Sequence, residues 1–545
     1  MILCFEFRIC LGIRDSDFEF LQQEGNKMKE AFLGLVILTV VSVCHAYDWS
    51  TNPGDGTPEN PYQLSEPNHL IAIGADPNLL DKHFILTSDI TFDPENIPTH
   101  IFDKALIAPD IDNTTTGFQG TAFTGVFNGA HHKISYLTIV NTGTNDFIGL
   151  FGYINGDNKA TEIVKDLTLY GTYVETESSD YVGSLAGRLE NGTLRNCIIE
   201  ASSFMGVEIG FVGGNKYVGG LAGHIQSGDI KNCSYDGQIL GGEQVGGLVG
   251  WIYSGLIKNC TSSGSVYGFN MVGGIVGRSG TGKCIVTIEG SVTTISLIYG
   301  EQLTENEIII TDNKTDAYVS GDFSCGGLVG ILSWGAISKC FSNATVRNID
   351  NFGGGFAGCL LTCSTENCYA NIDLKSKQDS GGFCGAFSRG SIANCYCVGI
   401  IDRYEGWMIP SAFIGFAWEP GTVEACYHNT PDYSPPFFGT KLTDAQMKQQ
   451  ANFTGWDFVG DETDGNNEIW RMCADGVDYP RLSWEFAQNG DFACPDGTDL
   501  TDLQALAQNW LTAAEITPDA FNYACDTNAD EHISLPDFST LAENW

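Results

Sequence analysis

Acidic residues near the C-terminus of this 545-residue chain have the spacing of a calcium-binding loop. Between Asp526 and Asp537, oxygen-bearing residues stand at loop positions 1, 3, 5, 9 and 12. Ca²⁺ takes about six to eight oxygen ligands from a loop of this kind. Glu531 stands where such loops use glycine, which makes the turn costlier. The expected ligands are the side chains of Asp526, Asn528 and Asp530, the carbonyl of His532, a water on Ser534, and Asp537 closing the site.

This loop is the second of two similar segments. A shift of 35 residues places Asp491 and Asp502 at positions 1 and 12 of a first loop, but Ala493 and Pro495 stand at its positions 3 and 5. Calcium in the first loop is therefore left open. A helix with a matching apolar stripe follows each loop, so the two helices can bury these stripes against each other. Cys494 and Cys525 flank the loops, and a disulfide between them is one alternative.

Catalytic motifs are not evident in the rest of the chain. It holds neither a His-Glu-x-x-His zinc helix nor a Gly-x-Ser-x-Gly nucleophile elbow. A pair of carboxylates, as in glycosidases, stays open as an alternative, because 67 acidic residues offer many such pairs.

The middle of the chain repeats one phrase, represented by Val245-Gly-Gly-Leu-Val-Gly250. Gaps between copies run from 27 to 36 residues, apart from one of 53. The closing glycines are Gly152, Gly187, Gly223, Gly250, Gly277, Gly330, Gly358 and Gly385. A cysteine lies ten residues after the closing position in seven copies, at Cys197, Cys233, Cys260, Cys340, Cys368, Cys395 and Cys426. Such a period indicates a repeat architecture in which each unit buries its apolar face against its neighbours.

The repeats predict strands rather than helices. Each period holds three short, glycine-bounded apolar runs, for example Gly246 to Ile252, Leu256 to Cys260 and Ser265 to Tyr267. Two-residue hairpin loops are scarce, which favours coils of three strands stacked in parallel about 4.8 Å apart. We expect about ten or eleven coils in residues 141–430, with the 53-residue gap as an aberrant coil or a protruding loop. The cysteines should form an interior column of buried thiols, with disulfides between coils as the alternative.

Two family resemblances rest on these motifs. The phrases at Gly219 to Gly223, Gly246 to Gly250 and Gly326 to Gly330 resemble the GLUG motif of bacterial secreted and surface proteins. This resemblance covers about residues 140 to 430 and implies a right-handed parallel β-helix like that of pectin lyases and filamentous adhesins, without implying one activity. Residues 489–545 resemble a dockerin, a small α-helical module with EF-hand-type loops. That resemblance implies calcium-dependent folding and docking to a cohesin-type partner, often on proteins that handle polysaccharide.

The composition limits the partners. The formal net charge is −40, and no basic patch is visible, so nucleic acid is an unsuitable partner. Anionic polysaccharides and acidic membranes are disfavoured for the same reason, unless a divalent cation bridges the two surfaces. Beyond the first 46 residues, no stretch is long and apolar enough to span a bilayer.

The segments divide the chain into six parts. From Met28, a lysine, an apolar run of about 13 residues and a final Ala46 have the pattern of a signal peptide. Residues 431–488 contain a helix-capping Thr443-Asp-Ala-Gln446, and their Trp456, Phe458, Trp470, Tyr479, Leu482 and Trp484 should cover the last coil or form an aromatic platform for carbohydrate. The expected parts are 1–27, a start-site artefact; 28–46, the signal peptide; 47–140, an N-terminal cap and first coils; 141–430, the GLUG-repeat β-helix; 431–488, its C-terminal cap; and 489–545, the dockerin-like module.

Together these features predict a secreted or cell-surface, non-catalytic β-solenoid with an adhesive or glycan-contacting face. A calcium-dependent dockerin-like module would display it or assemble it with a cohesin-type protein. The alternative is a polysaccharide lyase or glycoside hydrolase on the same scaffold.

Overall fold

The computed structural model describes residues 47–92, 100–112, 114–204, 207–280, 283–289, 292–298, 308–404, 410–430, 438–460, 467–487, 491, 500–508, 525, 533–534, 537–539 and 542. The predictions made for residues 1–46 lie outside this part of the chain.

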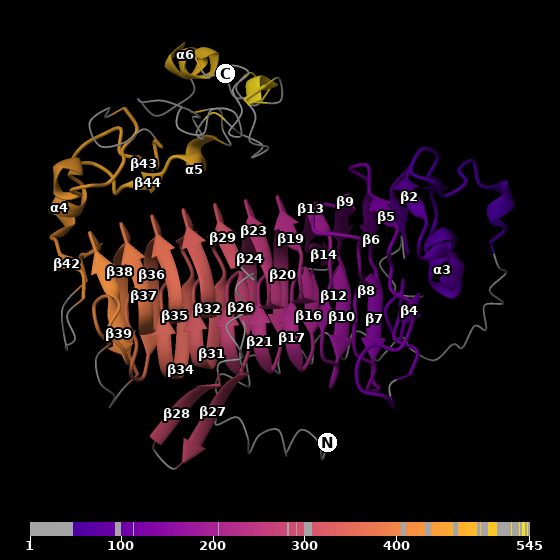
Figure 1. The fold of residues 1–545 in the computed structure, drawn as a ribbon, viewed down its shortest axis with the longest axis horizontal. Coiled ribbons are helices and arrows are strands. Elements are labelled where there is room, and N and C mark those ends of the chain that lie inside the picture. The colour runs from indigo at the N-terminus through magenta and orange to yellow at the C-terminus, as the bar shows by residue number, and fades with distance from the viewer. Residues whose placement is uncertain are drawn as a thin grey trace.

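Parallel strands wound into a stack of coils make up most of the described chain (Figure 1). Equivalent residues of successive repeats pair directly, as where Val249 and Ile252 of one coil pair with Val276 and Ser279 of the next. The strands after the closing glycines form one column: β8 (Phe151–Ile154), β12 (Ala186–Leu189), β18 (Ala222–Ile225), β22 (Val249–Ile252), β26 (Val276–Ser279), β32 (Val329–Ser338), β35 (Ala357–Glu366), β37 (Cys384–Ala393) and β39 (Ile414–Ala417). This confirms a mainly β fold whose long parallel sheet matches the predicted β-helix.

Further columns complete each coil. The second contains β9 (Glu162–Tyr170), β13 (Thr193–Glu200), β19 (Asp229–Lys231), β23 (Gly255–Lys258), β29 (Ile308–Thr311), the later parts of β32, β35 and β37, and β40 (Thr422–Glu424). The third contains β20 (Ser234–Leu240), β24 (Thr261–Tyr267), β30 (Lys314–Thr315), β33 (Phe341–Ser342), β36 (Tyr369–Ser376), β38 (Tyr396–Arg403), β41 (Tyr427–His428) and β42 (Thr440–Lys441). The remaining strands lead back to the glycine phrase: β7 (Thr138–Asn141), β10 (Tyr173–Thr176), β11 (Val182–Gly183), β16 (Phe211–Gly213), β17 (Lys216–Gly219), β21 (Glu243–Gly246), β25 (Asn270–Gly273), β31 (Tyr318–Gly326) and β34 (Thr345–Gly354).

The glycine phrase makes a sharp bend that splits one predicted strand in two. The expected run from Gly246 to Ile252 is interrupted, because β21 ends at Gly246 and β22 begins at Val249. A Cβ atom on Gly246 would lie 2.0 Å from the carbonyl oxygen of Val249, and one on Gly250 would lie 2.5 Å from the backbone of Tyr217 in the coil before. Only glycine permits both approaches. The repeat from Glu243 to Tyr267 therefore has four strands rather than the three expected.

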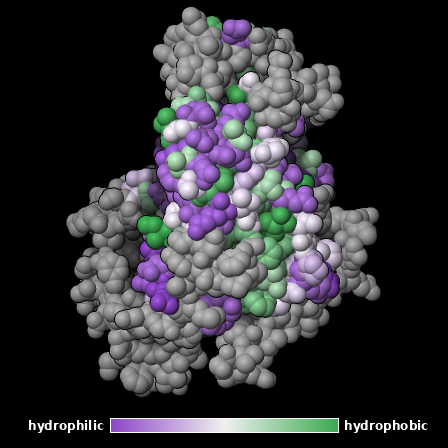
Figure 2. Space-filling view, turned by 90° about the vertical axis from the view of Figure 1, so that its left-hand side faces the viewer, coloured by the Kyte–Doolittle hydropathy of each residue, from purple (hydrophilic) through white to green (hydrophobic). Residues whose placement is uncertain are grey.

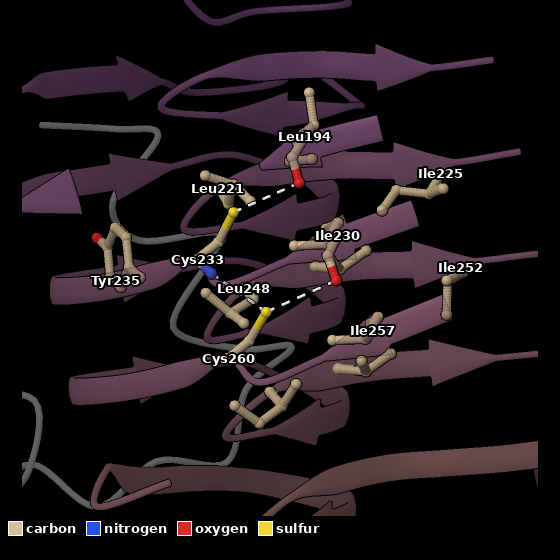
Figure 3. Packing of buried hydrophobic residues seen from close by; sticks show 14 of the residues in the cluster. Leu194, Leu221, Ile225, Ile230, Cys233, Tyr235, Leu248, Ile252, Ile257 and Cys260 are labelled. Atoms are coloured by element: carbon tan, nitrogen blue, oxygen red, sulfur yellow. Dashed lines mark hydrogen bonds between the residues drawn. The ribbon is translucent and has the colours of Figure 1, made fainter. Parts of the chain in front are cut away.

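The cysteines form the predicted interior column, and those of the column are buried and free. The backbone N–H of Cys197 donates to Sγ of Cys233 over 3.4 Å, and that of Cys233 donates to Sγ of Cys260 over 3.4 Å. The thiols of Cys233 and Cys260 in turn face carbonyl oxygens of the preceding coil (Figure 3). Burial raises the pKa of Cys340, Cys368 and Cys395 well above the usual value for a thiol. These groups are therefore neutral packing elements, and the alternative of disulfides between coils is wrong.

The 53-residue gap is one coil with a protruding loop, not two coils. β26 pairs directly with β32, so Gly277 and Gly330 belong to neighbouring coils. The extra residues include an antiparallel hairpin, β27 (Lys283–Glu289) with β28 (Val292–Ile298), which projects from the stack (Figure 1). Between residues 141 and 430, the first column accordingly has nine described strands, fewer than the ten or eleven coils expected there.

Asn313 occupies the cysteine position in this coil. Its side chain is fully buried. Its Oδ1 accepts from the backbone N–H of Cys260 over 2.8 Å, its Nδ2 donates to the carbonyl of Ile257 over 2.9 Å, and its own N–H donates to Sγ of Cys340 over 3.4 Å. The buried column therefore continues without a break from Cys260 to Cys340.

The second column continues towards the N-terminus through β5 (Val126–Asn128), β2 (His83–Leu86) and β1 (Tyr62–Leu64), which pair in parallel in that order from β9. Smaller elements lie at both ends of the stack. The N-terminal part contains β1 (Tyr62–Leu64), α3 (Pro67–Ala75), β2 (His83–Leu86), β3 (Ile90–Thr91), β4 (Ile101–Phe102), β5 (Val126–Asn128), β6 (Lys133–Ser135) and the short 3₁₀ turns η1 (Trp49–Thr51) and η2 (Pro77–Leu79). A second small hairpin pairs β14 (Ser202–Phe204) with β15 (Val207–Ile209). The C-terminal part contains α4 (Asp444–Met447), η3 (Gln450–Asn452), β43 (Trp470–Arg471), β44 (Arg481–Leu482), α5 (Trp484–Ala487) and α6 (Leu500–Gln508). The predicted capping box is confirmed, since Thr443 and Gln446 bond to each other's backbone N–H at the start of α4.

The described helices and the surface at one end of the stack bear on contacts outside the protein. In the described ranges, no helix has the length and apolarity needed to cross a bilayer. At the C-terminal end of the stack, hydrophobic surface is interspersed with hydrophilic surface (Figure 2). Phe416 and Trp418 of the last coils contribute exposed aromatic surface there, at 37% and 41% exposure.

Asn313 provides a test of the column. Asn313→Cys should be nearly neutral, because it restores the residue type of the neighbouring coils. Asn313→Leu should lower the free energy of unfolding by about 2 kcal/mol, because it leaves the N–H of Cys260 and the carbonyl of Ile257 buried without this partner. Denaturant unfolding followed by circular dichroism measures both. Equal stability of the two variants would contradict the role given to the amide.

Candidate functional site

Aromatic side chains form a second stacked column on the outside of the coils. Each follows a cysteine of the interior column, and successive residues of a strand point to opposite faces, so the ring lies outside where the thiol lies inside. Phe341, Tyr369, Tyr396 and Tyr427 pair in register across four coils. The rings of Phe341 and Tyr369 are 4.8 Å apart and inclined by 2°, and those of Tyr369 and Tyr396 are 5.0 Å apart and inclined by 4°.

The segment after the last coil folds back over this column. Its buried residues form an apolar cluster with the outer rings, separate from the solenoid interior; they include Met447, Phe453, Trp456, Phe458, Trp470 and Leu482. Indole N–H groups attach it to the solenoid. Trp456 donates to the carbonyl of Ala425 over 3.0 Å, Trp470 to Oδ1 of Asn367 over 3.3 Å, and Trp484 to the carbonyl of Lys339 over 2.9 Å. The predicted aromatic cover therefore lies along the side of several coils, rather than over the last coil alone.

A cleft of about 360 Å³ opens between the coils and this segment. We call residues 478–485 the wall and the rings of Phe341, Tyr369 and Tyr396 the floor. The other lining residues come from the edges of the coils and are Lys314, Asp316, Asn343, Asn371 and Val398. Tyr396 fixes one wall position directly, because its hydroxyl donates to the carbonyl of Pro480 over 2.6 Å.

Glu485 is the buried charged group of the cleft. Its side chain is 4% exposed. One carboxylate oxygen accepts from Nη2 and Nε of Arg481 over 2.7 and 3.0 Å, and the other accepts from the hydroxyl of Tyr369 over 2.9 Å and the N–H of Leu482 over 2.8 Å. Burial raises the pKa of Glu485, and Arg481 opposes that rise. Burial also raises the pKa of Tyr369 well above the usual range. The carboxylate thus joins floor to wall.

The rim of the cleft is polar and nearly neutral. Nδ2 of Asn343 donates to Oδ1 of Asp316 over 2.9 Å, and Asn371 follows at the same position of the next coil. Lys314 and Arg481 stand against Asp316, Asp478 and Glu485, a formal charge of −1. Since the floor rings stack on one another, their faces are occupied. Recognition of a ligand here would rest mainly on hydrogen bonds from the rim.

The structure describes only part of the predicted calcium loop. Asp526, Asn528, Asp530 and His532 lie outside the described residues. Asp537 is fully buried, and its Oδ2 accepts from the N–H of Ser534 over 2.7 Å, so these two predicted ligands lie together at the end of the loop. Within the described ranges, no group of three or more His, Cys, Asp or Glu side chains is arranged for a metal ion.

Cys525 is fully buried, whereas Cys494 lies outside the described residues, so the alternative of a disulfide between them stays a prediction. Cys473, which precedes the wall in the sequence, is disulfide-bonded.

The cleft was not predicted from the sequence, although the sequence contains a pattern that indicates its floor. Cys340-Phe341, Cys368-Tyr369, Cys395-Tyr396 and Cys426-Tyr427 repeat an aromatic residue after the interior cysteine, which predicts an outer aromatic column. No comparable signal marks Arg481, Trp484 or Glu485, because these wall residues are far in sequence from the floor; Glu485, for example, follows Tyr369 by 116 residues. The aromatic residues predicted to form either a cap or a carbohydrate platform fall into two groups. Buried in the covering segment, as expected for a cap, are Trp456, Phe458, Trp470 and Leu482. Tyr479 and Trp484 instead line the cleft.

Comparisons with known proteins agree with the repeat. The family model of the GLUG motif matches residues 214–239 and 241–267. A curated protein named Halomucin, from Haloquadratum walsbyi (strain DSM 16790 / HBSQ001), is 36% identical over 143 residues, which is 26% of this chain. The chain spans about 1% of the length of that relative. A crystal structure assigned to a candidate immunoglobulin A1 protease from Bacteroides ovatus is 16% identical, with 79% of this chain and 94% of that chain covered, but a TM-score of 0.33 is too low to establish a shared fold.

Glu485 gives a test of how the wall is held. Glu485→Ala should destabilise the folded protein by about 2–3 kcal/mol, because Arg481 and Tyr369 lose a buried acceptor; the half-exposed guanidinium keeps the figure below that of a fully buried pair. Glu485→Gln should cost less, since its amide oxygen can still accept one of these bonds. Chemical denaturation followed by tryptophan fluorescence measures the difference. If alanine were no worse than glutamine, the carboxylate would not be the link described here.

Proposed function

We propose that this protein is a secreted or cell-surface β-solenoid that holds a polysaccharide in its lateral cleft without cleaving it. The observation that carries the proposal is the cleft itself, which has the size of a small-ligand site and a few polar groups over an apolar floor. The GLUG motif and the similarity to Halomucin support a surface or secreted setting.

The charge of the site favours a neutral glycan. The chain carries −40, and the cleft adds no net positive charge, so an anionic chain would be repelled. Sugar hydroxyls can both donate and accept, which suits a rim of amides, carboxylates and a lysine such as Asn343, Asn371, Asp478 and Lys314.

The second candidate is a polysaccharide-degrading enzyme, lyase or hydrolase. The raised pKa of Glu485 favours it, because a protonated carboxyl can act as a general acid. Against this, both oxygens of Glu485 already accept hydrogen bonds within the protein. Glu485→Gln separates the two: if the cleft only binds, the variant forms no product from any glycan, like the parent protein. New reducing ends or unsaturated products from the parent, lost in this variant, would establish the enzyme instead.

Obstructing the cleft should abolish glycan binding. Asn371→Trp should weaken binding to a retained neutral glycan at least tenfold, because the indole would fill the space beside the floor. The matched control is Asp236→Trp, at the same position of an earlier coil and outside the cleft. Affinity electrophoresis on a panel of neutral and uronate polysaccharides measures both variants. Equal loss in both would place the binding surface elsewhere.

We further propose that residues 489–545 form a calcium-stabilised docking module for a cohesin-type protein. The predicted ligands all offer oxygen, the donor Ca²⁺ prefers, and Ser534 and buried Asp537 lie together as the second loop requires. Side chains of Asp526, Asn528 and Asp530, the carbonyl of His532, water on Ser534, and Asp537 would hold the ion.

Removal of calcium tests this module. EGTA should make residues 526–545 sensitive to protease, because ligand binding stabilises only the folded loop, while the β signal in circular dichroism stays unchanged. Mapping of the fragments by mass spectrometry measures it. Protease resistance that does not change between calcium and EGTA would refute the calcium assignment.

A further inference from the structure

The first loop, residues 491–502, has its leading carboxylate bound to an arginine of the preceding segment. Nη2 of Arg471 donates to Oδ1 of Asp491 over 2.5 Å, and Nη1 donates to the backbone carbonyl of the same residue over 2.7 Å. The two side chains are only 2% and 9% exposed. A buried, charge-assisted pair with two donors of one guanidinium is strong and directional.

Arg471 is itself held from several sides. Its guanidinium lies 4.3 Å from the ring centre of Phe486, whose ring also meets the guanidinium of Arg481 at 4.6 Å. Nε of Arg471 lies 3.0 Å from Sγ of Cys473, which is disulfide-bonded. Arg481 in turn binds Glu485 in the cleft. The arginine therefore belongs to the solenoid side and presents a fixed positive charge to the first loop.

This arrangement does not suit calcium in the first loop. Position 1 must give its carboxylate to the ion, but here that carboxylate is neutralised by a guanidinium. Positions 3 and 5 are Ala493 and Pro495, which have no side-chain oxygen. A divalent cation next to a buried guanidinium would also be repelled. The second loop keeps Asp526, Asn528 and Asp530 at the same positions.

We infer that Arg471 takes the place of the cation in the first loop. This loop binds no calcium and is fastened to the solenoid by an ion pair that is the same with and without calcium. The inference extends the proposed docking module, but the fastening by Arg471 does not require that the second loop bind the ion.

Two matched aspartates test the inference in the full chain. Asp491→Asn removes the charge at position 1 of the first loop, and Asp537→Asn removes it at position 12 of the second. Both are compared with the parent by limited proteolysis in calcium and in EGTA, with the cleavage sites mapped by mass spectrometry. Cleavage under these conditions reports the population of the opened segment.

Asp491→Asn should speed cleavage within residues 488–512 about tenfold, by the same factor in calcium and in EGTA, because it breaks a buried pair. Arg471→Met should match it, and the double variant should be no worse than either single one. Asp537→Asn should speed cleavage within residues 526–545 in calcium only. An unchanged β signal confirms that each variant has folded.

Two results would overturn the inference: an Asp491→Asn effect that appears only in calcium, or no effect of Asp491→Asn in either condition. Two calcium ions per chain by isothermal titration would overturn it as well. A calcium-independent Asp491→Asn effect beside a silent Asp537→Asn would support the role of Arg471 and refute the proposed calcium module instead.

Discussion

The structure depends on the parallel, in-register stacking of each coil on the next. Every residue position must suit the same position above and below it, because the strand spacing leaves little room for a side chain of different shape in the interior. Gly250 cannot carry a Cβ atom because the backbone of Tyr217 in the neighbouring coil lies too close. The interior thiols follow the same constraint, with the N–H of Cys197 and Cys233 each directed at the next sulfur. One local phrase, repeated, is therefore sufficient to build a long core.

The same stacking creates outer columns as a by-product, and the cleft uses one of them. A strand that buries a cysteine must present the next side chain outward, so a repeated Cys-Tyr pair gives a repeated ring on the outside. Four such rings would leave a large apolar stripe exposed to water. The segment after the last coil covers most of that stripe and leaves part of it as the cleft floor. Glu485 then has a structural reason to be buried, because it accepts from floor and wall together.

The periodic part of the fold could be predicted from the sequence, and the aperiodic part could not. The spacing of Cys197 to Cys426 indicates the interior column, because an offset held in seven copies requires that each coil be wound in the same way. The predicted number of coils is wrong because the length of a sequence gap does not show whether its residues form another coil or a protruding loop. In the coil of the 53-residue gap, the interior position is occupied by Asn313 instead of cysteine, so the repeat is not visible there. The hairpin that follows Gly280 adds residues without adding a coil. The cleft wall was missed for a different reason. Tyr369 and Glu485 are brought together by docking of two separate segments, and nothing local in either one encodes the other.

The segment that covers the outer rings also holds the start of the first loop, residues 491–502. Arg471 and Arg481 both contact the ring of Phe486, one guanidinium directed at the first loop and the other at the cleft. Two arginines on one ring repel each other unless each has its own carboxylate, and Asp491 and Glu485 supply these. Ala493 and Pro495 supply no side-chain oxygen at positions 3 and 5 of the first loop. Asp491 at position 1 is nevertheless held, because the fixed guanidinium of Arg471 neutralises its carboxylate.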